Sequence, residues 1–153
     1  MNLRIGFGFD SHEFDFKKPC FLGGIEIPEE PGFKAHSDGD LILHALCDAL
    51  LSAAQEPDLG TLFPDTLEVN KNRSSEEFLK EALSRVSKKG LKLLSVDITL
   101  VGDRPKIMPY RELIVKNLKE LLKTEFVGLK GKTSEGLCIK GMACFAVVLL
   151  NGS

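Results

Sequence analysis

The chain has 153 residues, a length that fits one domain with room for a hydrophobic core. Its apolar content of 43%, charged content of 27% and formal net charge of −2 are typical of a globular protein, and exclude a general nucleic-acid-binding protein, which needs a basic face. We expect no membrane partner, because no apolar run reaches the length of a membrane span, and no signal peptide, because the N-terminus lacks the pattern of one. The four scattered cysteines favour a reducing compartment, and a cytoplasmic location is expected.

Hydrophobic patterning and turn residues predict the elements of the first half in chain order. A strand is expected over residues 3–9, and a second over 21–27 with two glycines inside it. The proline- and glycine-rich stretch 28–34 is expected to be a loop that leads into a helix over 40–54. Residues 57–72 are expected to be irregular.

Clear start and stop signals organise the second half. Ser74 and Glu77 have the spacing of a capping box, and the helix that follows them is expected to stop at Gly90. The remaining elements are a strand over 91–101, a helix from Pro109 through 123, and strands over 126–133 and 142–150. This mixed order predicts an α/β or α+β sandwich of sheet and helices, in one domain covering residues 1–153.

Ionisable side chains interrupt an otherwise apolar helix at a spacing of four. They lie on one helical stripe: Asp40, His44, Asp48 and Ser52. Burying such a stripe without partners would cost several kcal/mol per charge, so the pattern indicates a bound metal or a reacting ligand. Because the rest of this helix is apolar on all sides, oligomerisation is expected as a way to bury it.

A second polar pair lies upstream of this helix. Asp10 and His12 are two residues apart, so on an extended strand they project to the same side. Together with His44 they make a three-point metal site. Two imidazoles and one carboxylate suit zinc, and three protein ligands leave a fourth position open, as in catalytic sites. The alternative for each histidine is an ordinary hydrogen-bonded core or surface residue.

Several blocks of this sequence resemble one enzyme family in order and spacing. They are Gly6-Phe-Gly-Phe-Asp10-Ser-His12, Gly23-Gly24, Ala35-His-Ser-Asp-Gly-Asp40 with Leu43-His44-Ala45, Asp58-Leu-Gly60, Leu62-Phe-Pro-Asp-Thr66, Pro105-Lys106-Ile-Met108-Pro109 and Lys132-Thr-Ser-Glu135. The family is 2-C-methyl-D-erythritol 2,4-cyclodiphosphate synthase, and the resemblance covers essentially the whole chain.

The resemblance implies an activity in non-mevalonate isoprenoid biosynthesis. The implied substrate is 4-diphosphocytidyl-2-C-methyl-D-erythritol 2-phosphate, whose 2-phosphate attacks the β-phosphate and displaces CMP. The product is 2-C-methyl-D-erythritol 2,4-cyclodiphosphate. The implied assembly is a homotrimer whose sheets surround its axis, with active sites between subunits. This reaction mainly requires that the substrate be positioned and that the charge of its phosphates be neutralised.

The resemblance also implies the roles of the metal ligands. Asp10, His12 and His44 would hold Zn²⁺ or another divalent transition metal, and Glu135 would hold Mg²⁺ or Mn²⁺ together with the substrate phosphates. Asp48 would orient the His44 ring; its alternative is a plain helix-surface carboxylate.

The remaining implied site residues contact the substrate. His36 and Thr133 would be catalytic, holding the methylerythritol phosphate and the attacked phosphate. The implied substrate contacts are Ser37, Asp58, Gly60, Phe63, Asp65, Gly102, Pro105, Lys106, Ile107, Met108, Lys132 and Ser134. Three alternatives stay open: a helix cap for His36, a solvated loop lysine for Lys106, and ordinary turn chemistry for Thr133 and Ser134.

The sequence departs from the family pattern near its C-terminus. The segment from Gly136 to Ala143 is several residues shorter than usual, and the family's usual phenylalanine and arginine have no counterparts. Lys140 is a candidate replacement for the lost cation, as a point charge without the planar fork of arginine.

Two other functions are compatible with the metal-site pattern. A zinc-dependent phosphoester hydrolase would use a metal-bound hydroxide and release linear products. A non-catalytic zinc-binding trimer would use the metal only to hold the fold together. Structural zinc sites are normally closed and cysteine-rich, whereas none of the four cysteines lies beside the histidines in sequence.

Overall fold

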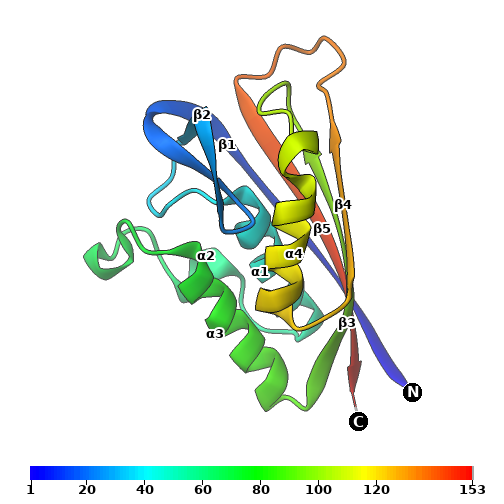
Figure 1. The fold of residues 1–153 in the computed structure, drawn as a ribbon. Helices are drawn as coiled ribbons and strands as arrows, with labels where there is room; N and C mark the ends of the chain where they lie inside the picture. The colour runs from blue at the N-terminus through cyan, green and yellow to red at the C-terminus, as the bar shows by residue number, and fades with distance from the viewer. Residues whose placement is uncertain (153) are drawn as a thin grey trace.

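A five-stranded mixed sheet with helices packed on one face forms the α+β fold (Figure 1). The computed structural model describes residues 1–152; Ser153, the last residue of the predicted domain, lies outside the described residues. The strands are β1 (Asn2–Leu22), β2 (Ile25–Phe33), β3 (Leu91–Val101), β4 (Phe126–Lys132) and β5 (Gly141–Gly152). The helices are α1 (Leu41–Ala53), α2 (Leu59–Leu62), α3 (Ser75–Lys88) and α4 (Arg111–Leu122), with short 3-10 turns η1 (Glu68–Asn70) and η2 (Met108–Tyr110).

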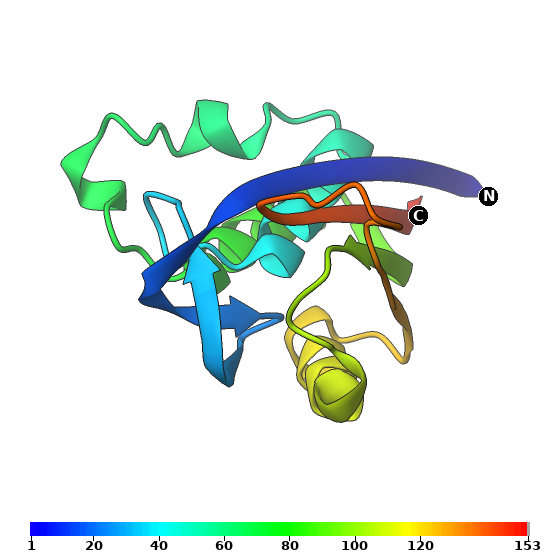
Figure 2. The same cartoon turned by 90° about the horizontal axis from the view of Figure 1, so that it is seen from above.

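The strand order is β2-β1-β5-β3-β4, and only the β3–β4 pair is parallel. The view from above shows the β1–β2 hairpin bending away from the rest of the sheet toward α4 (Figure 2). Among residues 1–152, no helix has the length and apolarity that crossing a membrane requires.

The prediction for the first strand was too short. β1 continues past Phe9 because it has two partners in succession: β5 up to Glu13, and β2 from Phe14 onward. The glycine pair predicted inside a second strand is instead the turn of this hairpin. Gly23 and Gly24 both have positive φ, 64° and 81°, which a two-residue turn of the type I′ kind requires.

Most of the proline-rich stretch 28–34, which was predicted as a loop, belongs to the strand β2, of which only residues 25–27 were predicted as strand. Because β2 lies at the edge of the sheet, with β1 as its one neighbour, Pro28 and Pro31 do not interrupt a ladder on both sides. The prediction failed because proline was treated as excluded from strands, whereas it is excluded only from central ones.

The second half of the chain agrees with its prediction. The strand and helix predictions after Ser74 are confirmed with shifts of one or two residues. The capping box is an exception. Ser74 does cap α3, but its side chain accepts from the N–H of Glu76, while Glu77 pairs with Arg73 at 2.9 Å.

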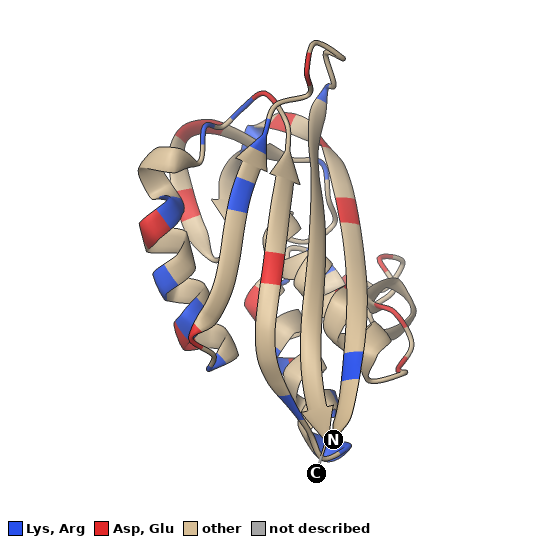
Figure 3. Cartoon of the chain, turned by 90° about the vertical axis from the view of Figure 1, so that its right-hand side faces the viewer, with Lys and Arg blue, Asp and Glu red and all other residues tan. Residues whose placement is uncertain are grey.

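Helix α1 is buried within a single chain. The expectation that oligomerisation is needed to cover this helix is therefore wrong. It packs against β1, β5 and α3, and its residues from Leu41 to Leu51 are buried apart from Asp48. The unpaired apolar surface is instead the opposite face of the sheet. Large apolar side chains exposed there are Leu3, Ile5, Phe7, Phe9, Phe145 and Val147. Figure 3 shows the central strand β5 of this face without a charged residue.

The polar residues of the α1 stripe have different structural roles. Asp40 is the N-cap of the helix and accepts from the N–H of Leu43 at 3.1 Å. The same buried carboxylate accepts from the N–H groups of Gly23 and Gly24 at 2.9 and 2.7 Å. It therefore ties the start of α1 to the hairpin turn, and the helix-cap alternative for His36 is ruled out by this assignment.

Two glycines of β1 let α1 lie directly on the strand. A Cβ at Gly6 would come within 1.9 Å of the carbonyl oxygen of Ala49, and one at Gly8 within 1.9 Å of that of Ala45. Both obstacles are helix backbone, which cannot rotate aside. Any side chain at these positions must push the helix off the sheet.

We predict that Gly8→Ala destabilises the fold by about 3 kcal/mol, because the added methyl group overpacks the α1–β1 contact. The measurement is chemical denaturation followed by circular dichroism. Gly60→Ala is the control, since a Cβ there meets no described atom within 4 Å. Equal stability of Gly8→Ala and the wild type would contradict the packing argument.

Candidate metal centre and active site

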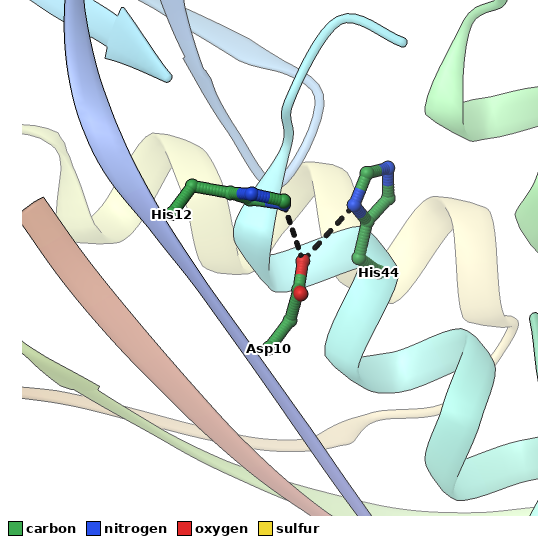
Figure 4. A group of neighbouring side chains, drawn as sticks. All are labelled: Asp10, His12 and His44. Carbon is green, nitrogen blue, oxygen red and sulfur yellow. Dashed lines mark hydrogen bonds and ion pairs between the residues drawn. The ribbon is translucent and has the colours of Figure 1, made fainter. Parts of the chain in front are cut away.

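Three of the predicted ligands converge at the contact between β1 and α1 (Figure 4). Asp10 and His12 follow Gly6 and Gly8 on the face of β1 that α1 covers, and His44 comes from α1. Asp10 Oδ2 lies 3.0 Å from His12 Nε2 and 3.0 Å from His44 Nδ1. The three candidate ligand atoms all lie within 4.8 Å of one another.

The charges of this cluster favour an ionised carboxylate. Burial acts to raise the pKa of the Asp10 carboxyl, but the close contacts and charges of His12 and His44 outweigh it and bring the pKa to about 2. For His44, burial acts to lower the pKa, whereas the hydrogen bond and charge of Asp10 raise it, and the net direction is upward. The cluster thus combines one fixed negative charge with two imidazoles.

The geometry fits a metal ion better than a set of ordinary hydrogen bonds. His12 Nε2 is buried without a hydrogen-bond partner in the described residues, although it lies close to Asp10. Ligands of one tetrahedral zinc ion are roughly 3.3 Å apart, which follows from metal–ligand distances near 2 Å. One carboxylate and two imidazoles at these separations are a donor set for zinc or another divalent transition metal.

A pocket of about 320 Å³ opens above the three ligands. Its lining includes the predicted catalytic residue His36, the predicted substrate contacts Ser37, Gly60, Phe63 and Asp65, and Asp48, which was expected to orient His44. The Nε2 atom of His36 is buried there without a hydrogen-bond partner in the described residues. A ligand in this pocket would therefore meet an imidazole with unused hydrogen-bonding capacity.

Two acidic residues hold α2 at the edge of this pocket. Asp48 accepts from the N–H of Leu59 at 2.9 Å, and Asp58 caps α2 by accepting from the N–H of Thr61 at 2.9 Å. The expected contact from Asp48 to the ring of His44 is not among the hydrogen bonds of the described residues. Asp48 lies one helical turn beyond His44 and faces α2 instead.

The residues expected at the nucleotide lie elsewhere on the chain. A second hollow of about 140 Å³ is lined by Gly102, Pro105, Lys106, Ile107, Met108, Lys132 and Thr133. Ser134 is buried behind it, where its N–H and Oγ donate to Asp103 at 2.9 and 2.7 Å. Glu135 is exposed and accepts from Thr133 Oγ1 at 3.3 Å. This hollow and the pocket above the three ligands share no lining residue.

Sequence reasoning missed the groups behind the metal cluster. Ser75 Oγ lies 2.8 Å from His44 Nε2 and is hydrogen-bonded to the carboxylate of Asp38. Arg73 lies over the rings of Phe63 and Phe78, 5.3 and 5.8 Å from their centroids. Ser75 is 31 residues from His44 and 37 from Asp38, so no local pattern could have revealed these contacts.

Three candidate ligands converge beneath an open pocket on an α+β fold, an arrangement consistent with a metal site that keeps an open position and typical of enzymes rather than of structural metal sites. A sequence model of the YgbB family matches residues 3–151. The 2-C-methyl-D-erythritol 2,4-cyclodiphosphate synthase of Aquifex aeolicus is 49% identical over 98% of both chains. A Thermus thermophilus enzyme of the same name is 48% identical over 98% of this chain and all of its own.

Solved structures agree with these sequence matches. A 2C-methyl-D-erythritol-2,4-cyclodiphosphate synthase in a CDP-bound form superposes with a TM-score of 0.91 at 46% identity, covering 97% of this chain and 100% of its own. The bifunctional IspDF from Campylobacter jejuni gives a TM-score of 0.94 at 36% identity, covering 99% of this chain and 43% of its own.

The chain belongs to the family of 2-C-methyl-D-erythritol 2,4-cyclodiphosphate synthases. It is an enzyme of the phosphorus–oxygen lyase class and acts in the non-mevalonate route to isoprenoids.

We predict that the purified protein binds one Zn²⁺ per chain and that His44→Ala weakens this binding at least roughly 100-fold, because it removes one of three ligands. Competition with a chromophoric chelator measures the dissociation constant. His36→Ala is the matched control, since His36 lines the pocket but is not one of the clustered ligands. Unchanged zinc affinity in His44→Ala would rule out this metal centre.

Proposed function

We propose that this chain converts 4-diphosphocytidyl-2-C-methyl-D-erythritol 2-phosphate into 2-C-methyl-D-erythritol 2,4-cyclodiphosphate and CMP by intramolecular attack. The observation that carries the proposal is the Asp10–His12–His44 cluster at the base of the first pocket. A reaction within one bound molecule needs no protein nucleophile. The protein has to bend the substrate and neutralise its phosphates.

Asp10, His12 and His44 are proposed to hold Zn²⁺, the metal that best suits two imidazoles and one carboxylate with an open position. When bound there, zinc would supply Lewis-acid neutralisation of phosphate charge. Glu135, a single exposed carboxylate, is proposed to hold Mg²⁺ or Mn²⁺, hard cations that retain waters and phosphate oxygens as ligands.

Residues of the first pocket are proposed to hold the methylerythritol phosphate. The buried Nε2 of His36 lacks a partner among the described residues and can engage a phosphate oxygen. Ser37 lines the same pocket, where its Oγ accepts from the N–H of Gly39 at 3.3 Å. Asp58 and Gly60 are proposed to contact substrate hydroxyls from α2, with Phe63 and Asp65 beside them.

Residues of the second hollow are proposed to hold the cytidine end. The backbone of the loop from Gly102 to Met108 is suited to hydrogen-bond a cytosine ring, and the CDP-bound relative supports a cytidine nucleotide as the ligand class. Lys132 and Thr133 are proposed to contact the diphosphate, with Thr133 fixing the phosphate under attack, whereas the predicted contact Ser134 already donates its N–H and O–H to Asp103. Lys106 adds a mobile positive charge at the rim.

We propose that the active site is shared between subunits. The substrate joins a methylerythritol phosphate to a cytidine diphosphate, and one end is proposed for each of the two hollows, which share no lining residue. The apolar sheet face around Phe7, Phe9 and Phe145 is a surface that a second copy of the chain would cover. A homotrimer with sheets around its axis brings the first pocket of one subunit to the second hollow of the next.

We predict that phosphorus NMR of the protein with this substrate, Zn²⁺ and Mg²⁺ shows a cyclic diphosphate and stoichiometric CMP. His44→Ala should slow this conversion at least roughly 100-fold, which corresponds to the loss of about 3 kcal/mol of transition-state stabilisation. Linear phosphate products would instead indicate the hydrolase, and zinc binding without turnover a non-catalytic trimer.

We also predict that two inactive variants restore activity when they assemble together. His44→Ala damages the first pocket, and Glu135→Ala removes the proposed Mg²⁺ ligand that follows Thr133 of the second hollow, so a mixed trimer contains one undamaged site at the interface between unlike subunits. Random mixing of equal amounts should recover about one quarter of the wild-type activity. Co-expression with two different affinity tags isolates the mixed trimers. Absence of recovery in them would place each active site within one chain.

A further inference from the structure

The Nε2 atom of His44, which points away from Asp10, has hydrogen-bond partners within the protein. His44 Nε2 lies 2.8 Å from Ser75 Oγ and 3.0 Å from Ser37 Oγ. Ser75 is the first residue of α3 and is fully buried. The proposed metal ligand is therefore packed between α1 and the start of α3, with a hydroxyl group on each side of this nitrogen.

The direction of the hydrogen bond from Ser75 is set by Asp38. The carboxylate of Asp38 also accepts from the N–H of Ser75 at 3.0 Å and from the N–H of Asp40 at 3.1 Å. An ionised carboxylate has no hydrogen to give, so the O–H of Ser75 must donate to Asp38. The oxygen of Ser75 then presents a lone pair to His44 Nε2, and Nε2 must carry the hydrogen of this contact.

The hydrogen on Nε2 determines the state of the other ring nitrogen of His44, Nδ1. In a neutral imidazole one nitrogen carries hydrogen and the other carries a lone pair. With hydrogen on Nε2, the lone pair belongs to Nδ1, which lies 3.0 Å from Asp10 Oδ2 and faces the proposed metal position. Ser37 does not fix this direction, because its hydroxyl can either donate or accept.

We propose that Asp38 and Ser75 are positioning residues that select the metal-binding tautomer of His44 and hold its ring in place. The inference rests on the proposed metal centre. Groups that accept the outer N–H of a ligating histidine raise its basicity and fix its orientation, and their loss typically weakens metal binding 10–100-fold. Here a serine transmits the effect of the carboxylate to the ring.

Ser75→Ala tests this relay. Its zinc dissociation constant should rise roughly 10–100-fold, measured by chelator competition. Asp38→Asn should act in the same direction, because its amide presents N–H where a carboxylate oxygen accepts. Ser74→Ala is the matched control: the neighbouring serine caps α3 through the N–H of Glu76 without contacting His44, so its zinc affinity should equal that of the wild type.

A spectroscopic readout separates positioning from general loss of stability. In the zinc-loaded wild type, ¹⁵N-detected NMR of the histidine rings should show His44 with hydrogen on Nε2, protected from exchange with solvent. Ser75→Ala should lose this protection. Hydrogen on Nδ1 in the wild type, or unchanged zinc affinity in folded Ser75→Ala and Asp38→Asn, would overturn the relay while leaving the metal centre intact. Failure of the wild type to bind zinc would overturn the metal centre itself.

Discussion

The direct contact between the α1 backbone and the two glycines of β1 is the constraint on which the site depends. Because Gly6 and Gly8 have no Cβ, the carbonyl oxygens of Ala49 and Ala45 lie where side chains would otherwise stand. Asp10 continues the same face of β1, so a helix that lies this close brings His44 to within 3.0 Å of its carboxylate. The ligand separations are thus a result of backbone packing, and strand and helix cannot move apart without separating the donors.

The four polar residues that form a stripe on the buried helix α1 do not share one role. At a spacing of four, Asp40 anchors the hairpin turn, His44 enters the metal cluster, Asp48 holds the start of α2, and Ser52 faces solvent. Each of the three inner groups has partners that offset the cost of its burial. For Asp40 burial raises the pKa, while the N–H groups of Gly23, Gly24 and Leu43 act to lower it. Partners in the surrounding structure, which the helix sequence does not contain, decide which of these roles each residue takes.

Features set by local geometry could be predicted from the sequence, whereas features set by contacts between distant residues could not. The clustering of the candidate metal ligands was predictable because Asp10 and His12 share a strand face by local geometry, and His44 was an ionisable group on an apolar helix. The length of β1 and the continuation of β2 beyond Ile27 were not, because the hydrogen bonds of these segments go to partners far away in sequence or across a turn. Asp38 and Ser75 were missed for a similar reason: their roles arise only when the start of α3 packs beside α1.

The distribution of apolar surface explains why folding of one chain and completion of the active site are separate problems. Helix α1, the most apolar segment, is already covered in one chain, so the monomer does not need a partner to build its core. What remains uncovered is the sheet face that carries Ile5, Phe7 and Phe145, and it lies on the side of β1 opposite to Asp10 and His12. Successive residues of β1 therefore serve two surfaces: one face builds the metal centre, and the other is available for assembly. In the proposed trimer, the strand that fixes the proposed zinc ligands is also the strand that positions the neighbouring subunit. Small changes of twist in β1 would alter the metal centre and the subunit interface together.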